Sequence, residues 1–238
     1  MSELPPLREF PIFAAFDDAT LRRLASEAKV ETYADGEAIF RQGDAASALM
    51  LVVSGFVKLL RTSASGDETV ICIRGDRAAI ADAPTSVHET CHVSAEAVGP
   101  TTVLKIPASK FRGLMAEQPA LAMAALDEAK RAVAELVGEI ESLKSHSADQ
   151  RLARFLLSLC PAEAERRRFR LPYDKRLIAA RLGVTQETLS RAFARLREFG
   201  VRTETRDVSV ESAARLRAQY HDLERPGAAP GPRLGEGG

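Results

Sequence analysis

The sequence predicts an α+β fold in which a jelly-roll-type β-roll is followed by one long helix and a small helical domain. Three observations along the 238 residues predict this order. Glycines recur every 7 to 12 residues between short β-rich pieces in residues 30–106. Apolar residues then repeat at steps of three and four over residues 119–145. Finally, two short amphipathic patterns meet at a glycine within residues 171–200.

The β-roll is predicted to occupy residues 1–118 and to begin with short helices. Asp17 and Asp18 can cap a helix that starts near residue 18, because their carboxylates accept hydrogen bonds from its first N–H groups. D-G, G-D and S-G pairs indicate turns farther along the chain. The strand candidates between these turns are Ala38–Arg41, Leu49–Val53, Phe56–Arg61 and Thr69–Ile73.

Residues 119–146 are predicted to form a dimerisation helix. Their apolar seam has the heptad spacing of a parallel two-stranded coiled coil. The alternative is a surface helix that packs on its own domain. Ser147 or Asp149 would begin the next helix, and Pro161 would end it. The seam consists of Leu126, Ala129, Val133, Leu136, Ile140 and Leu143.

Two short helices joined by a tight turn are predicted next. Asp174 and Thr185 are suitable N-caps, and Gly183 between the helices allows a sharp turn at low steric cost. This arrangement predicts a helix-turn-helix. The apolar positions are Leu177, Ile178, Ala180 and Leu182 in the first helix and Leu189, Phe193 and Leu196 in the second.

A β-hairpin is predicted after the second helix, at Val201–Val210. With this hairpin as its wing, the region 147–224 forms a winged helix-turn-helix. Residues 225–238 have the Pro- and Gly-rich composition of a disordered tail.

The polar side of the second helix is suited to base edges in a DNA major groove, because Arg donates twice to guanine and Glu accepts from cytosine. The alternative is an ordinary solvated helix with a Glu–Arg pair four residues apart. Charge favours DNA. Residues 151–200 contain 12 Lys and Arg against 5 Asp and Glu, whereas residues 1–118 contain 12 against 16. The polar side carries Gln186, Glu187, Ser190, Arg191 and Arg195.

The run GVTQETLSR, from Gly183 to Arg191, resembles the recognition helix of the CRP/FNR superfamily of bacterial transcription regulators. Its E-x-x-S-R form is closest to the FNR branch and the Dnr-type, nitric-oxide-responsive branch. The resemblance implies that the Glu and Arg read a G·C pair, that the Ser contacts a thymine, and that Lys175 touches phosphate. The operator would be an inverted repeat of TTGAT-type half-sites. The expected DNA contacts are Thr185, Gln186, Glu187, Thr188, Ser190, Arg191, Arg195 and Lys175.

The order DGEAIFRQGD, LMLVVSGFVKLL and ICIRGD resembles the cyclic-nucleotide-binding β-roll that forms the sensor of this family. Family members that bind cyclic nucleotides hold the ribose with a Glu and the phosphate with an Arg-Ser pair. Here Ile80 stands near the Glu position, and Cys91 and His92 stand near the Arg-Ser position. The pocket has therefore lost its cation, and cyclic AMP is not expected.

The effector is a separate question, because one β-roll hosts different ligands. An iron–sulfur cluster is not expected, because the first cysteine is Cys72 and too few thiolates are available. Haem is a candidate cofactor for nitric oxide sensing, with His88, Cys91 or His92 as the axial ligand. The alternatives are ordinary hydrogen-bonded roles for both histidines, a thiol redox switch at Cys91, a small organic effector, or no effector.

The sequence thus predicts a cytoplasmic, homodimeric transcription activator that binds double-stranded palindromic DNA, with RNA polymerase as a candidate partner. A coiled coil would place two reading helices about one DNA turn apart. No apolar run approaches 18 residues, and no signal peptide or disulfide framework is visible. The competing class is a β-roll regulatory subunit that does not bind DNA. An enzyme is not expected, because no nucleophile elbow, P-loop, dinucleotide fingerprint or HExxH pattern occurs.

Overall fold

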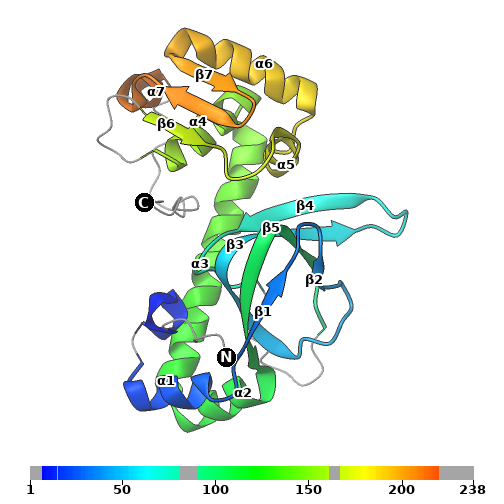
Figure 1. Cartoon of the computed structure of the whole chain (residues 1–238), viewed down its shortest axis with the longest axis vertical. Helices are drawn as coiled ribbons and strands as arrows, with labels where there is room; N and C mark the ends of the chain where they lie inside the picture. The colour runs from blue at the N-terminus through cyan, green and yellow to red at the C-terminus, as the bar shows by residue number, and fades with distance from the viewer. Residues whose placement is uncertain (1–6, 15, 81–89, 161–166, 220–238) are drawn as a thin grey trace. The chain divides into compact units, whose positions relative to one another are not determined.

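The computed structural model describes residues 7–14, 16–80, 90–160 and 167–219 (Figure 1). The chain divides into two compact units, residues 1–132 and residues 133–238. The first unit is built around an antiparallel sheet, and the second combines short helices with a small sheet. The predicted α+β class is confirmed. Among the helices of the described ranges, none has the length and apolar character needed to cross a bilayer.

The sheet of the first unit has the strand order β1-β5-β3-β4, and β2 also pairs with β5. All of these pairings are antiparallel, as Figure 1 shows for the long strands β3 and β5. Neither β1 nor β5 was among the four strand candidates, although both lie in the predicted β-rich region. The strands are β1 (Lys29–Tyr33), β2 (Ala38–Phe40), β3 (Ala48–Thr62), β4 (Glu68–Arg74) and β5 (Ser94–Pro107).

Strand β3 corrects one prediction. Leu49–Val53 and Phe56–Arg61 were expected to be separate strands with a turn at the S-G pair, but they form one continuous strand. The pairing register between β3 and β5 shifts on both sides of Ser54, and Gly55 has φ +93°. The S-G pair therefore marks a β-bulge, because glycine adopts a conformation that kinks a strand without ending it.

The sheet is covered by apolar packing on both faces. Leu49 and Leu51 of β3 belong to a core shared with the N-terminal helices, whereas Met50 and Val52 belong to a second core inside the β-roll. Successive side chains of a strand point to opposite faces. The uninterrupted apolar run in β3 therefore reflects burial on both sides of the sheet.

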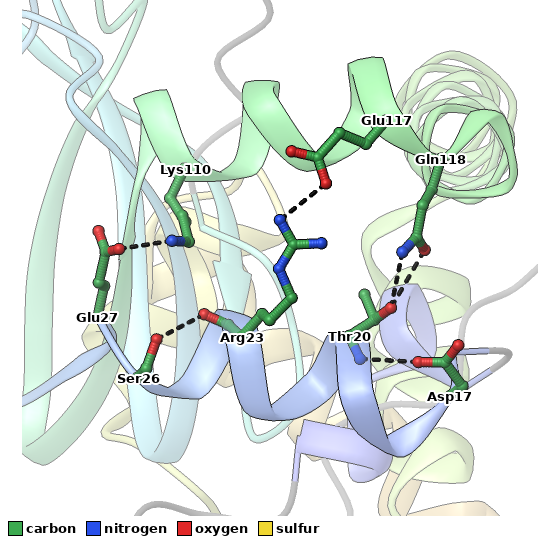
Figure 2. Close-up of polar contacts among 8 residues, drawn as sticks. All are labelled: Asp17, Thr20, Arg23, Ser26, Glu27, Lys110, Glu117 and Gln118. Carbon is green, nitrogen blue, oxygen red and sulfur yellow. Dashed lines mark hydrogen bonds and ion pairs between the residues drawn. The ribbon is translucent and has the colours of Figure 1, made fainter.

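Helices α1 (Asp18–Ala25) and α2 (Ala108–Glu117) lie side by side and are joined by polar contacts (Figure 2). Asp17 accepts from the backbone N–H of Thr20 at 2.7 Å, which confirms the predicted cap. The buried hydroxyl of Thr20 exchanges hydrogen bonds with the Gln118 amide at 3.0 and 3.2 Å. The short helices η1 (Leu7–Glu9) and η2 (Pro11–Phe13) precede α1 and contribute to the same core, as predicted.

Helix α3 (Pro119–Ser145) is one continuous helix, as the heptad pattern predicts. Leu121 near its start is buried in the core of the first unit. All six predicted seam residues are exposed in the single chain, although the side chain of Leu143 also lies close to Gly183. This exposed apolar side leaves the seam open to a partner. The exposed large apolar residues of α3 are Met123, Leu126, Val133, Leu136, Val137, Ile140 and Leu143.

The second unit has the strand order β6-β8-β7 in its sheet. Of the two predicted caps for the helix after α3, Ser147 is the N-cap, and it forms a capping box with Gln150. That helix ends at Ser158; Pro161 and residues 225–238 lie outside the described residues. The elements are α4 (Ala148–Ser158), β6 (Arg167–Arg170), α5 (Lys175–Arg181), α6 (Gln186–Leu196), η3 (Arg197–Phe199), β7 (Val201–Glu204), β8 (Asp207–Val210) and α7 (Ala213–Gln219).

The predicted wing is confirmed as the β7–β8 hairpin, but it has a third strand that was not predicted. Strand β6 pairs with β8 through a four-residue, Arg-rich segment, RRFR, which lacks the alternation that would have revealed it. One helical position was also wrong. Ala180 is exposed and Ala179 is buried, because two alanines in sequence give no apolar contrast from which to choose the inner face.

Candidate nucleic-acid interface

Helices α5 and α6 begin at the predicted N-caps. The Asp174 side chain accepts from the backbone N–H of Leu177 at 2.7 Å. The Thr185 hydroxyl accepts from the backbone N–H of Thr188 at 3.2 Å and donates to the Thr188 hydroxyl at 3.1 Å. These bonds satisfy N–H groups that have no partner within the helix, and they fix where each helix begins.

The turn between the two helices depends on Gly183, which has φ +62°. Most side chains avoid this left-handed conformation, and glycine adopts it without steric cost. A Cβ at this position would also lie 2.9 Å from Cδ2 of Leu143, in the last turn of α3. The glycine therefore permits both the turn and the close approach of the Leu143 side chain.

Helix α6 has one buried side and one exposed side. Leu189, Phe193 and Leu196 are buried as predicted, together with Ala192. The opposite side carries the exposed side chains of Gln186, Glu187, Ser190, Arg191 and Arg195. The helix is therefore anchored in the unit along one face, and it presents a row of donors and acceptors on the other.

The charged pair in this row is suited to reading base edges. Glu187 and Arg191 are four residues apart, so they lie on adjacent turns of one face. The pKa of Glu187 lies below its usual value, first because its carboxylate accepts from its own backbone N–H, and further because the polar side chain of Thr185 and the positive charge of Arg191 are near. Glu187 is therefore an ionised acceptor at neutral pH. The side chains of Gln186, Ser190 and Arg191 make no hydrogen bond or ion pair with any described residue.

Lys175, the predicted phosphate contact, is the first residue of α5. Its Nζ lies 5.1 Å from the centre of the Phe193 ring, in a cation–π contact that places the ammonium group beside α6. The pKa of Lys175 is lowered, first by partial desolvation and then by the positive charge of Arg197. Two cationic side chains this close to each other define a locally positive surface, as a phosphate group requires.

Arg195 differs from Gln186, Ser190 and Arg191 because its guanidinium is already bound in an ion pair. Its Nε lies 2.6 Å from Oδ2 of Asp149, and its Nη2 donates to Oδ1 at 2.8 Å. This forked pair was not expected, because Asp149 was considered only as a helix cap. The interaction joins residues 46 positions apart, which no local sequence pattern reveals.

Arg206, in the wing turn, is an arginine that the sequence analysis did not single out. Its Nη2 donates to the backbone carbonyl oxygens of Leu171 at 2.8 Å and Pro172 at 2.7 Å. The neighbouring Thr205 has φ +51°, an uncommon conformation for a non-glycine residue. Arg206 thus fastens the wing to the segment that leads into the Asp174 cap.

Of the three predicted haem ligands, the structure describes Cys91 and His92. Ile80 and Cys91 are buried in the core inside the β-roll, and the backbone of Cys91 pairs with Gly43 and Asp44. His92, the next residue, is exposed. His88 lies outside the described residues. No group of three or more His, Cys, Asp or Glu side chains suited to a metal ion occurs in the described ranges.

The fold and this surface define a class of protein: an antiparallel β-roll, a long helix and a winged helix-turn-helix with a polar second helix. Comparisons with known proteins agree with this class. Residues 30–118 match the cyclic nucleotide-binding domain, and residues 150–219 match the Crp-like helix-turn-helix domain.

Similar proteins give the family. The chain is 32% identical to the cyclic AMP receptor protein of Thermus thermophilus, over 77% of this chain and 84% of that protein. It is 30% identical to the transcriptional activator protein Anr of Pseudomonas protegens, over 68% of each. A Ruegeria pomeroyi structure described as a cyclic nucleotide binding protein is 34% identical, with a TM-score of 0.67, covering 90% of this chain and 95% of that chain. This chain belongs to the CRP/FNR family of DNA-binding transcription regulators.

Proposed function

We propose that the exposed side of α6 reads DNA bases, and that Lys175 holds a phosphate beside it. The supporting observation is that four buried side chains anchor α6, while the side chains of Gln186, Ser190 and Arg191 make no hydrogen bond or ion pair with any described residue. Thr185, Glu187 and Thr188 complete the proposed surface. Donors that are not already paired can bond to base edges without first breaking an internal contact.

The proposed operator is an inverted repeat of TTGAT-type half-sites, which requires two reading helices related by a two-fold axis. We propose that the apolar side of α3 supplies this symmetry by pairing with a second copy of the chain. Its seam is exposed in the single chain at every predicted position, and a second copy would remove it from water.

In this proposal residues 1–118 form the sensor, residues 119–146 the dimerisation helix and residues 147–224 the DNA-binding domain. The family matches over residues 30–118 and 150–219 support this division. We further propose that the protein activates transcription, since relatives such as Anr are named transcriptional activators. An effector would control DNA binding by favouring one arrangement of the two reading helices over another.

Cyclic AMP is not the proposed effector, although one relative is named a cyclic AMP receptor protein. Ile80, at the position where a Glu would hold the ribose, is packed in the core, and its backbone N–H donates to the carbonyl of Met50. An apolar side chain in this environment supplies no hydrogen bond to a ribose hydroxyl.

For haem we propose a histidine ligand rather than Cys91. The Cys91 side chain packs among apolar residues inside the β-roll, and the exposed His92 follows it directly, so the two side chains do not share one surface. The haem hypothesis therefore depends on His88 or His92. An absorption spectrum after reconstitution, with and without nitric oxide, tests it: a stoichiometric Soret band lost in H88A or H92A supports haem, and a band that washes off contradicts it.

The DNA-reading proposal is tested with Arg191→Ala and Lys175→Gln on duplexes that carry every substitution of the TTGAT half-site. R191A should cost about 1–3 kcal/mol per half-site and relax preference at one base pair. K175Q should weaken binding to all sequences alike and reduce the salt slope by about one. Unchanged base preference in R191A would contradict the assignment of α6 as the reading helix.

A further inference from the structure

The Asp149–Arg195 pair has the geometry of a structural contact. Nε and Nη2 of Arg195 each contact a separate carboxylate oxygen of Asp149, at 2.6 and 2.8 Å respectively. This is the planar forked arrangement that only arginine can form. The Asp149 side chain is only 17% exposed. By contrast, the Arg202–Glu211 pair of the same unit is long, at 3.5 Å, and both of its side chains are more exposed.

The two residues also lie where their charges suit their helices. Asp149 is in the first turn of α4, where the helix dipole favours an anion, and Arg195 is in the last turn of α6, where it favours a cation. The same two helices each bury an apolar face that includes Leu152 and Phe155 of α4. The ion pair therefore fixes the end of one packed helix against the start of the other.

The first turn of α4 is bonded to α3 as well. Arg151 donates from Nη1 to the backbone carbonyl of Leu143 at 3.2 Å, in the last turn of α3. The turn itself is held by the Ser147–Gln150 capping box. Polar contacts thus run from the end of the proposed dimerisation helix, through the first turn of α4, to the C-terminal turn of the reading helix.

We propose that Arg195 is a positioning residue for DNA recognition, and that it acts through Asp149 rather than by contacting DNA. It holds α6 at a set position relative to the first turn of α4, so that the base-reading side chains meet the groove together. This inference rests on the proposed reading role of α6. It gives Asp149, an acidic residue, a favourable effect on DNA binding.

The sign of the Asp149→Asn effect distinguishes positioning from direct contact. If Arg195 bound phosphate, D149N would release it and remove a negative charge, and binding would tighten or stay the same. If Arg195 positions α6, D149N should lower the ratio of specific to non-specific affinity about fivefold, the size expected for a well-formed but partly exposed pair. R195A should lower the ratio similarly and leave the salt slope unchanged, whereas loss of a phosphate contact reduces that slope by about one.

The experiment uses the full chain and the duplex that the wild-type chain itself enriches from a random library, so that an error in the TTGAT half-site does not affect it. Affinities for this duplex and for a scrambled duplex are measured by fluorescence anisotropy over a range of salt concentrations. E211Q is the matched control, because it removes an acidic partner of arginine in the same unit. It should leave the ratio unchanged.

Charge exchange separates positioning from misfolding. D149R and R195D should each lower the ratio, and the double variant D149R/R195D should lose less than either, because the pair is restored in reverse. Far-UV circular dichroism and thermal unfolding check that each variant is folded. A wild-type chain that binds its duplex while D149N binds it equally well or more tightly overturns this inference alone. A wild-type chain that enriches no duplex overturns the proposed function and this inference together.

Discussion

Replacing Ile140 by Ala on α3 should weaken dimerisation of the chain. Ile140 is 52% exposed in the single chain and lies on the heptad seam. Full burial of an Ile side chain contributes about 1.5–3 kcal/mol. Because about half of the Ile140 side chain is still exposed in the single chain, dimerisation would bury the other half. Truncation to Ala should therefore remove about 1 kcal/mol of dimer stability per chain. A symmetric interface contains the residue twice, so the dissociation constant should rise about 30-fold for a loss of about 2 kcal/mol.

Sedimentation equilibrium over a dilution series measures this constant directly for the wild-type and variant chains. Alanine has a higher helix propensity than isoleucine, so the substitution does not weaken α3 itself. The matched control is Ile71→Ala on β4, which removes the same atoms from a side chain that is 40% exposed. I71A should dimerise like the wild type. An unchanged constant in I140A, or an equal loss in I71A, would refute the proposed seam.

Three further substitutions test the first unit by urea unfolding. Gly55→Ala should destabilise it by at least about 2 kcal/mol, because the new Cβ would lie 2.6 Å from a backbone carbonyl of β5 at φ +93°; Gly66→Ala, at φ +90° with open space around it, should cost less. Thr20→Val should cost about 1 kcal/mol, since it removes the buried hydroxyl that pairs with Gln118, and no loss would mean that water replaces it. Asp76→Asn should stabilise the unit at neutral pH. Partial desolvation raises the pKa of Asp76 above its usual 3.8, although the residue is not buried. Its ionisation therefore costs stability as pH rises from 3.8 through the raised pKa, and the advantage of the variant should vanish as pH falls below 3.8. An advantage of D76N that persists at low pH would contradict this reasoning.

The parts that the sequence predicted depend on local interactions. Asp174 and Thr185 cap their helices through bonds to residues only three positions away, so the cap and its partner are visible together in a short stretch of sequence. Gly183 adopts its left-handed conformation because glycine has no Cβ, a property that is visible from the residue type alone. The buried and exposed sides of α6 follow from helical periodicity, which also placed the proposed base-reading residues on one face.

For two of the failed predictions, the deciding partner was distant in the sequence. The S-G pair of β3 is a bulge rather than a turn because β5 continues alongside it, more than 40 residues later. Strand β6 exists because β8 pairs with it. No pattern within either segment contains this information, since pairing between strands is a long-range contact.

The sequence alone therefore determined the order of the parts, the N-caps of the helices, the continuity of α3 and the polar face of α6. Periodicity, capping and charge act over a few residues, and each can be recognised without a folded chain. Only the tertiary structure decided that Cys91 is enclosed while His92 is exposed, and that Arg195 is held by Asp149 rather than left open to DNA. Both depend on which distant surfaces meet when the chain packs, and packing is a property of the whole fold.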